Sequence, residues 1–457
     1  MTEKEDVLQN YKVSFGEKCA FGIGDLAINF VWSSIGLFIV YFYTDVVGIS
    51  AGIVGILMLI SRVWDGISDI IMGGIIDKTD TKWGKARPWI LYLAVPFGIS
   101  TVLLFTVPQN FSNLLKIIYI FITYNFMVVM FTGVVIPYGT LNTLITRDIN
   151  ERSKLNLYRM FFAQIGIFIV GSCTLPLVRF YGNTQMSWAM TYATYSVIGV
   201  ILFLITFKFT KERVGVISNT TKQKVPVKES LKSLFKNKYW VIICIYMIVQ
   251  AIEGIITSTS TVYYAKYVMG DENIVKYFTA TGVIPTLLGI VFFISFLVER
   301  YGKRNVGIMG RIISIIGAIV ILLSNNNFAV VIIGSIMRGF AGGFGAAAGW
   351  AFFSDIIEYG EWKNGIRNEG VIYSAGSFGQ KVGSGIAAAL FGAILTAFGF
   401  KANAEITPPN TILAIKILFL YLPILGNILQ IILLYLYKLD KIYPQIIREL
   451  QERNNKN

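Results

Sequence analysis

The stretch AGIVGILMLISRVWDGISDIIMGGII, residues 51–76, indicates both the solvent that surrounds this chain and the chemistry inside it. A helix needs roughly 20 apolar residues to cross the hydrocarbon of a bilayer, and this stretch is long enough. Arg62, Asp65 and Asp69 nevertheless lie within it. An ionisable side chain at the membrane centre costs roughly 2.5–3.5 kcal/mol on insertion scales, so such residues point to a cavity lined by protein. The stretch therefore predicts a membrane helix that faces an internal site.

Eleven further stretches are apolar over a similar length, so the sequence predicts an all-α membrane protein with twelve transmembrane helices. The twelve candidates lie near residues 21–44, 51–76, 88–108, 115–140, 158–179, 188–208, 239–266, 277–298, 305–324, 328–353, 371–400 and 410–437. The composition is 55% hydrophobic and 14% charged, with a mean hydropathy of +0.63. Soluble domains carry about 25% charged residues, so the lipid bilayer is the expected partner of this surface.

The basic residues predict the orientation of the chain. If the N-terminus lies inside, the inside segments carry 29 Lys and Arg residues and the outside segments carry 6. This bias follows the positive-inside rule and predicts a multi-pass protein of the cell membrane with both termini in the cytoplasm. It also accounts for the net charge of +14 without any binding of nucleic acid.

A long polar stretch at 211–238 is expected to join two six-helix halves. The expected divisions are a cytoplasmic N-terminus at 1–20, an N-terminal bundle at 21–210, a central cytoplasmic loop at 211–238, a C-terminal bundle at 239–437 and a cytoplasmic tail at 438–457. Asp77–Pro88 and Glu299–Arg304 occupy matching places in the two halves, and each places an acid before a basic turn that contains Gly. Duplicated bundles with a binding site near the midplane are typical of secondary transporters.

Several function classes are excluded or disfavoured by composition. The chain contains no His, which removes imidazole ligands, His-dependent nucleophilic catalysis and any His proton relay. Cys19, Cys173 and Cys244 are far apart and form no metal-binding or disulfide pattern. We therefore expect no enzyme activity and no cofactor other than a coupling ion.

Asp65 and Asp69 are four residues apart, which places both carboxylates on one helix face. Two like charges this close favour protonation of one or the sharing of a cation. With the hydroxyls of Ser68 and Thr132 as neutral oxygens, the set suits Na⁺ or a proton. The alternative is a structural ion-pair network with Arg62.

Residues of the first span suggest how a solute is held. Asp25, Asn29 and Ser33 recur at helical spacing, and Trp32 lies beside them. Polar groups next to an aromatic ring suit hydrogen bonding and stacking against a sugar. The alternative for these residues is polar contact between helices.

Two cations lie within other spans. Lys381 has Gly and Ser neighbours in the eleventh span, and either acid of the second span is its expected partner. Arg159 opens the fifth span, where its side chain could instead extend to the interface. We expect both to belong to the solute site.

Charged loops predict a cytoplasmic gate. The segment 354–370 alternates acids and bases, and we expect it to pair with the 77–88 loop and with Arg147. The expected gate residues are Asp77, Arg87, Arg147, Asp355, Glu358, Glu361 and Arg367. Such surface pairs are worth under about 1 kcal/mol each, which suits a gate that must open, although a solvated loop is the alternative.

Four ordered motifs resemble the glycoside-pentoside-hexuronide:cation symporters of the major facilitator fold. These motifs are Tyr41–Gly48, Arg62–Asp69, Asp77–Pro88 and Asp355–Glu369, and the resemblance extends from about residue 15 to residue 442. It implies sugar uptake driven by Na⁺, Li⁺ or H⁺. By position it implies that Asp65, Asp69 and Thr132 belong to the cation site, Arg159 to the sugar region, and Lys381 to both.

The chain also differs from the melibiose carrier of that family. Asn29 and Val135 replace two sugar-binding acids, Gly139 replaces a tryptophan, and Ser68 replaces a cation-site asparagine. The loss of two carboxylates makes the expected cavity more positive. The hypothesis that follows is an anionic or less charge-demanding sugar, such as a hexuronide or a β-glycoside.

The predicted function is thus sugar and monovalent-cation symport by a monomer. A carrier of the same fold for a lysolipid or a drug, exported against H⁺, is the main alternative. An intramembrane enzyme would need a nucleophile–base set or a metal cluster, and a receptor would carry a ligand or effector domain. Neither pattern is found in the sequence.

Overall fold

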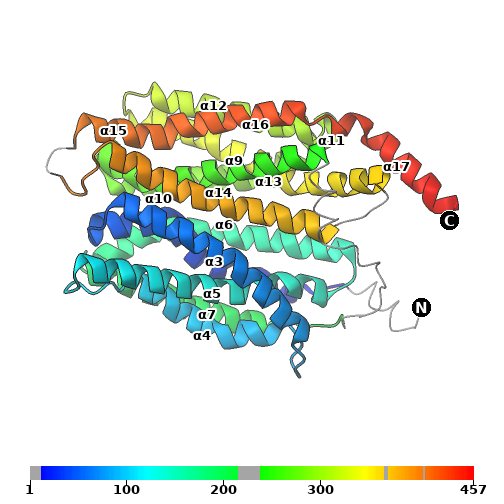
Figure 1. Ribbon diagram of the computed structural model, residues 1–457, viewed down its shortest axis with the longest axis horizontal. Coiled ribbons are helices and arrows are strands. Elements are labelled where there is room, and N and C mark those ends of the chain that lie inside the picture. Colours follow the sequence, from blue (N-terminus) through cyan, green and yellow to red (C-terminus); the bar gives the residue numbers. More distant parts are fainter. Residues whose placement is uncertain (1–11, 215–236, 365–368, 405–406, 457) are drawn as a thin grey trace. The chain divides into compact units, whose positions relative to one another are not determined.

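The computed structural model describes residues 12–214, 237–364, 369–404 and 407–456. The described residues are almost entirely helical and divide into two compact units (Figure 1). Unit 1 comprises Met1–Thr220, Asp271–Thr279 and Phe400–Ile406, and unit 2 comprises Thr221–Gly270, Ala280–Gly399 and Thr407–Asn457. The first boundary falls within the stretch that the sequence predicts to join two halves.

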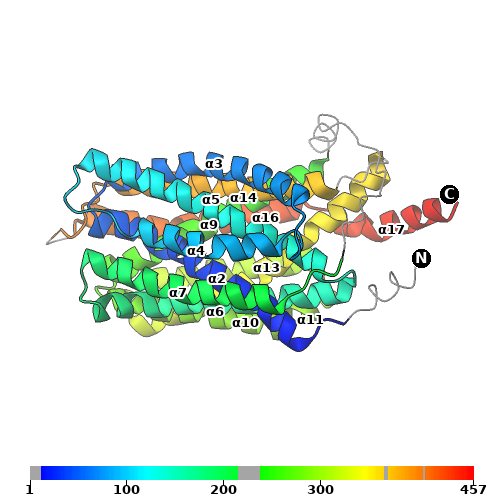
Figure 2. The same cartoon turned by 90° about the horizontal axis from the view of Figure 1, so that it is seen from below.

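Unit 1 is a bundle of long helices. They are α2 (Phe15–Ser34) with its π-helical continuations η1 (Ile35–Ile39) and η2 (Phe42–Val46), α3 (Ala51–Lys78), α4 (Arg87–Leu104), α5 (Asn113–Ile145), α6 (Ile149–Phe180) and α7 (Gln185–Phe209), with the short η4 (Glu272–Ile274). Within the bundle α2 packs against α6 and α7, while α5 packs against α3 and α4 (Figures 1 and 2). These contacts bring side chains of α2, α3, α5 and α6 into the interior.

Side chains at the helix starts explain where several helices of unit 1 begin. Ser14 accepts a hydrogen bond from the backbone of Glu17, and Asp148 accepts bonds from the first turn of α6. Thr184 and Ser187 form a reciprocal capping box at the start of α7. Each cap satisfies backbone N–H groups that the helix itself leaves without an acceptor.

Unit 2 is a second bundle. Its helices are α9 (Lys238–Tyr263) with η3 (Tyr264–Val268), α10 (Val275–Leu288) with η5 (Gly289–Ile294), α11 (Ser295–Tyr301), α12 (Lys303–Leu322), α13 (Phe328–Asn364), α14 (Glu369–Ala397), α15 (Pro409–Lys416) with η6 (Ile417–Tyr421), α16 (Leu422–Leu436) and α17 (Leu439–Lys456). Gly302 adopts a φ of 77° between α11 and α12, a conformation that favours glycine. Leu439 and Ile446 anchor α17 to the core of this unit.

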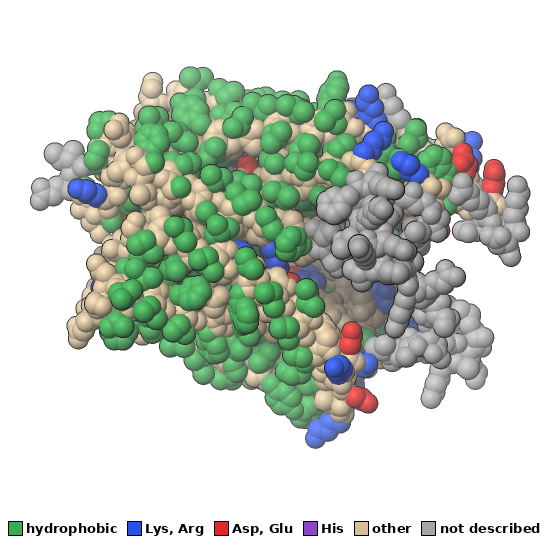
Figure 3. All heavy atoms as spheres, in the orientation of Figure 1, with side chains coloured by type: hydrophobic (Ala, Val, Ile, Leu, Met, Phe, Trp, Pro, Cys, Tyr) green, Lys and Arg blue, Asp and Glu red, His purple; other side chains and the backbone are tan. Residues whose placement is uncertain are grey.

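The surface of the helices fits a bilayer. Among the described residues, eleven helices are long and apolar enough to cross a membrane, and Phe328–Phe344 is a shorter apolar helix within α13. Hydrophobic side chains cover α12 and α16 on the face shown in Figure 3, whereas charged side chains gather where α16 leads into α17. Leu425 and Tyr435 of α16 are 61% and 67% exposed, as expected for lipid-facing positions. Each of the twelve predicted stretches lies mostly on one helix or on two or three consecutive helical segments, which confirms the predicted fold class.

Candidate functional site

The acid pair of α3 meets a hydroxyl of α5 inside unit 1. The Thr132 hydroxyl oxygen lies 3.1 Å from Asp69 Oδ1 and 3.4 Å from Asp65 Oδ1. It also lies 3.1 Å from the Ser68 hydroxyl oxygen. Asp65, Ser68 and Thr132 are buried, and Asp69 is half-buried. The structure thus brings together the four oxygen-bearing side chains that the sequence proposes for a cation.

Arg62 joins this cluster from one turn earlier on the same helix. Its guanidinium donates to Asp65 Oδ2 at 3.1 Å and lies over the Trp32 ring, 5.2 Å from the centroid. The ion pair that the sequence leaves open as an alternative is therefore present. It uses one oxygen of Asp65, while the other oxygen faces Thr132. Arg62, Asp65 and Asp69 together carry a formal charge of −1.

The solute residues of α2 divide into two groups. Trp32 stacks on Phe131 of α5 with centroids 5.1 Å apart, so its ring borders the cation cluster. The Asn29 amide instead donates to the backbone oxygen of Asp25, and a Cβ at Gly166 of α6 would lie 2.8 Å from Asn29 Cβ. Asn29 therefore lies where α2 packs on α6, and its role in binding a solute stays a prediction.

Arg159 of α6 pairs with Asp25 of α2. The distance from Arg159 Nε to Asp25 Oδ2 is 3.1 Å, and the side chains are 25% and 14% exposed. The guanidinium also lies over the Tyr138 ring at 4.7 Å and near Phe21. Arg159 is thus held inside unit 1, and the adjacent Tyr138 and Phe21 form an aromatic surface that sequence reasoning missed. Helical spacing carries no signal of this contact, because it joins residues far apart in the chain.

The remaining predicted solute residue, Lys381, is half-buried on α14 of unit 2. Its role at the cation and sugar sites stays a prediction.

The predicted gate residues are tied to neighbours within their own units. In unit 1, Arg87 donates to the backbone oxygens of Trp83 and Phe207. In unit 2, Asp355 pairs with Lys303, and Tyr443 of α17 donates to Glu358. Burial and the Glu358 carboxylate raise the pKa of the Tyr443 phenol, which keeps it protonated as a donor.

The structure gives little information on the remaining predicted gate residues. Asp77 is exposed, and its backbone oxygen accepts a bond from Lys85. Arg147 lies between α5 and α6, Glu361 lies on α13, and both side chains are half-buried. Arg367 lies outside the described residues. The proposed pairing of residues 77–88 with 354–370 stays a prediction.

Sequence reasoning also missed an anion cradle at the start of α4. The Glu212 carboxylate accepts bonds of 2.8, 2.9 and 2.8 Å from the backbone N–H groups of Lys85, Ala86 and Arg87. A helix N-terminus stabilises negative charge in this way. Gly84 makes room for it, since its φ is 104° and a Cβ there would lie 2.2 Å from Glu212 Oε2. The cradle ties the 77–88 loop to the residue stretch that follows α7.

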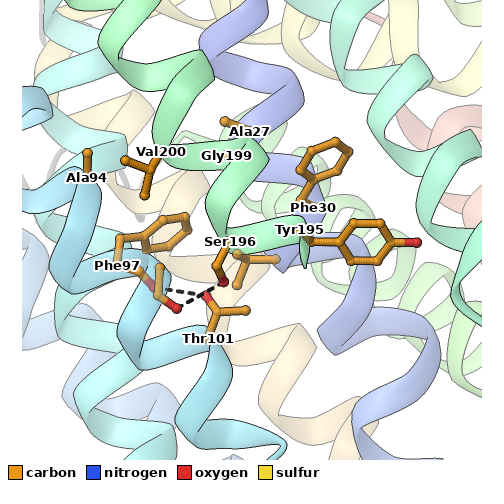
Figure 4. A pocket seen from close by; sticks show the side chains of 11 residues that line it. Ala27, Phe30, Ala94, Phe97, Thr101, Tyr195, Ser196, Gly199 and Val200 are labelled. Atoms are coloured by element: carbon orange, nitrogen blue, oxygen red, sulfur yellow. Dashed lines mark hydrogen bonds between the residues drawn. The ribbon is translucent and has the colours of Figure 1, made fainter. Parts of the chain in front are cut away.

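A small cavity lies between α2, α4 and α7 of unit 1 (Figure 4). Its lining is mostly apolar and includes Phe30, Phe97 and Val200. The Ser196 and Thr101 hydroxyls donate to backbone oxygens, those of Gly98 at 3.0 Å and Phe97 at 2.9 Å, and the Tyr195 hydroxyl lies 3.2 Å from that of Thr174. A sugar needs polar groups that converge on it, so this cavity is a packing gap rather than a solute site.

Comparisons with known proteins agree with this architecture. The family model described as "MFS/sugar transport protein" matches residues 20–441. An isoprimeverose transporter of Lactiplantibacillus pentosus is 34% identical, over 99% of this chain and 95% of its own length. A putative glycoside/cation symporter, YagG of Escherichia coli (strain K12), is 33% identical over 96% of this chain and 95% of its own length.

A solved structure shows the same fold. The crystal structure of a D-xylose-proton symporter superposes with a TM-score of 0.65 at 16% identity, over 91% of this chain and 97% of its own. The matches indicate a transporter and not an enzyme. The chain belongs to the MFS/sugar transport protein family, within its glycoside-pentoside-hexuronide:cation symporters.

Proposed function

We propose that this chain is a secondary active symporter that imports a sugar together with Na⁺ or H⁺ by alternating access. The observation that carries the proposal is the meeting of Asp65, Asp69 and Thr132 oxygens within 3.4 Å. Two buried or half-buried carboxylates beside hydroxyl oxygens form a donor set suited to a hard monovalent cation or a proton. The relatives named as an isoprimeverose transporter and a glycoside/cation symporter support the same activity.

The coupling step follows from the charges of α3. An entering cation lowers the repulsion between Asp65 and Asp69 and competes with Arg62 for Asp65. The Arg62 guanidinium lies over the Trp32 ring of α2, 5.2 Å from its centroid, so a shift of Arg62 changes its contact with the ring. If sugar and cation both favour the same closed state, each tightens the binding of the other by the same factor.

The sugar class follows from the pair between Asp25 and Arg159. The carboxylate balances the guanidinium at 3.1 Å, which removes the excess positive charge that the sequence alone suggests for this region. A balanced ion pair beside the Tyr138 ring suits hydroxyl groups and a sugar face. We therefore propose a neutral glycoside as the main substrate and a hexuronide as a weaker one.

Topology and assembly form part of the same proposal. The excess of Lys and Arg in the segments predicted to be inside supports cytoplasmic termini. We also propose a functional monomer, as the sequence predicts.

The test uses the purified full-length chain in proteoliposomes. The vesicles are offered isoprimeverose, other glycosides, pentosides and hexuronides under an inward Na⁺ gradient or an inward pH gradient, and the accumulated solute is identified by mass spectrometry. We expect accumulation of a neutral glycoside under one of the two gradients. Folded protein that accumulates no sugar under either gradient would overturn the proposal and favour a non-sugar cargo.

The variant Asp69→Asn should abolish accumulation yet retain downhill exchange, because the sugar site keeps its residues while the cation loses a charged ligand. Asp80→Asn is the matched control, since Asp80 is an exposed acid of the 77–88 loop outside the site. Unimpaired uphill uptake by Asp69→Asn would contradict the assigned role.

A further inference from the structure

Unit 2 contains a buried arginine that the proposed transport mechanism does not use. Arg311 of α12 is 6% exposed and donates to the Tyr246 hydroxyl of α9 at 2.9 Å. Its nearest acid is Glu253 of α9, at 3.9 Å from Nη1 to Oε2. That distance permits charge attraction but exceeds a hydrogen bond. The charged pair is therefore separated by a gap inside the bundle.

Polar atoms on the neighbouring helix α16 lack partners. Gln430 is fully buried, and neither its amide nitrogen nor its amide oxygen bonds to any atom of the described residues. Asn427 Oδ1 and Arg311 Nε are likewise without a partner there. Leaving such groups unpaired inside a membrane bundle is costly, because lipid offers no hydrogen bonds.

Two relationships between neighbouring helices show that these atoms lie at similar levels of the bundle. Arg304 at the start of α12 donates to the Leu434 oxygen of α16 at 2.7 Å, so Arg311, two turns further along, lies level with Asn427 and Gln430. A Cβ at Gly426 of α16 would lie 3.4 Å from Glu253 Cβ.

The relative direction of α9 and α16 shows where Gln430 lies along α9. The rings of Tyr239, at the start of α9, and Tyr437, after α16, are 5.5 Å apart, so α9 and α16 run in opposite directions. Gln430, one turn beyond Gly426, thus lies between the levels of Glu253 and Tyr246.

The unpaired atoms include both hydrogen-bond donors and acceptors, which determines the kind of ligand that fits them. Arg311 Nε and the Gln430 nitrogen need acceptors, whereas the Gln430 and Asn427 oxygens need donors. An anion would satisfy only the first two and would be repelled by Glu253. Water both donates and accepts, and buried waters typically make about three hydrogen bonds to such groups.

We propose that α9, α12 and α16 enclose an internal water site that bridges the Arg311–Glu253 pair through the Gln430 and Asn427 amides. The site lies within unit 2 and does not depend on which sugar or ion is carried. Because water can rearrange, the bridge lets the two charges separate or approach as these helices shift while both remain hydrogen-bonded.

The first test is the sign of a stability change in the full-length chain in detergent. Gln430→Leu keeps the volume of the side chain roughly constant and removes both amide atoms. If water bridges the site, the variant leaves the waters without partners, and Tm falls by roughly 2–4 °C. If the amide is dry, removing it raises Tm, which would overturn the proposal. Leu434→Met, at a fully buried position of the same helix, reports the cost of repacking alone.

The second test detects the water directly by pulsed X-ray hydroxyl-radical labelling. Radicals formed from bound water oxidise adjacent side chains without access to bulk solvent, so the fully buried Tyr246 should be oxidised. Tyr263, equally buried on α9, packs against the rings of Tyr267 and Phe391 and serves as the dry control. Labelling of Tyr246 at several times the Tyr263 level, and its loss in Gln430→Leu, supports the site. Equal labelling of the two tyrosines contradicts it.

Discussion

The Arg62 guanidinium donates to Asp65 Oδ2 at 3.1 Å, within one turn of α3, while Asp65 Oδ1 lies 3.4 Å from the Thr132 hydroxyl. The Asp65 carboxylate thus contacts both the Arg62 guanidinium and the site proposed for the coupling cation. A charged hydrogen bond of this kind is worth about 1.5–3 kcal/mol, so Arg62 competes measurably with an entering cation.

Arg62→Gln should tighten cation binding, because the substitution removes this competitor. The expected change is about a tenfold lower concentration of coupling cation for half-maximal sugar uptake, since 1.4 kcal/mol corresponds to tenfold. Uptake is measured in proteoliposomes across a range of cation concentrations. Arg62→Lys keeps the charge and serves as the control. A weaker or unchanged cation affinity in Arg62→Gln would show that Arg62 is purely structural.

Thr132 allows the hydroxyl ligand to be tested apart from charge. Thr132→Val keeps the shape of the side chain but removes the oxygen that lies 3.1 Å from Asp69 Oδ1, so cation affinity should fall about tenfold. Thr132→Ser restores the oxygen and should recover most of the affinity. The readout is the cation dependence of uptake, and equal damage by both substitutions would argue against a ligand role.

The pair between Asp25 and Arg159 predicts non-additive effects. Arg159→Gln leaves a largely buried carboxylate without its partner, and Asp25→Asn does the reverse. Breaking a buried pair costs about 3–5 kcal/mol, whereas removing both charges costs much less. The double variant should therefore be more stable than Arg159→Gln alone, as measured by thermal unfolding. Additive losses would show that the two charges do not interact.

The same variant tests the substrate proposal. Arg159→Gln should reduce uptake of a neutral glycoside and of a hexuronide by similar factors, because Asp25 already balances the guanidinium. A much larger loss for the hexuronide would favour the anionic sugar that the sequence alone suggests.

The membrane helices and the acid pair could be predicted from sequence because both follow from local periodicity. A helix that crosses a bilayer needs a long apolar stretch, which the sequence shows directly. Residues four apart share a helix face, so the closeness of Asp65 and Asp69 can be predicted from a single stretch. The sequence also proposes Thr132 as a neutral oxygen, and the structure places it beside both acids.

Contacts between distant helices could not be read in this way. Asp25 and Arg159 are separated by 134 residues, and nothing in their spacing indicates that α2 packs on α6. Glu253 and Arg311 likewise come from different helices, α9 and α12, so the sequence gives no sign that they face each other. Asn29 has the spacing of a residue that faces a cavity, yet it lies beside Gly166 of α6. Helical spacing shows which residues share a face but not which helix that face meets.

Gly84 should be far less replaceable than a glycine of similar backbone geometry. Gly84→Ala combines a φ of 104° with a Cβ that would lie 2.2 Å from Glu212 Oε2 and displace the carboxylate from its three N–H donors. Gly182→Ala shares the strain, with a φ of 103°, but its Cβ would meet only Ser187 Oγ at 4.0 Å. Backbone strain alone costs about 1–3 kcal/mol, so the larger fall in Tm expected for Gly84→Ala isolates the cradle. Equal falls would show that the Glu212 contacts add nothing to stability.

Unlike Gly84→Ala, the substitution Gly199→Ala should stabilise unit 1. It lies within α7 beside the apolar cavity of Figure 4, and a Cβ added there meets no atom within 4 Å. Gly199→Ala removes the helix penalty of glycine, about 0.8–1.0 kcal/mol, and adds a methyl group to the gap, so Tm should rise by roughly 2–4 °C. Gly98→Ala borders the same cavity, but its Cβ would lie 3.3 Å from Ser196 Cβ and from Val200 Cγ2. It should therefore gain less than Gly199→Ala or lose stability. A fall in Tm for Gly199→Ala would mean that the gap is needed for the packing of α2, α4 and α7.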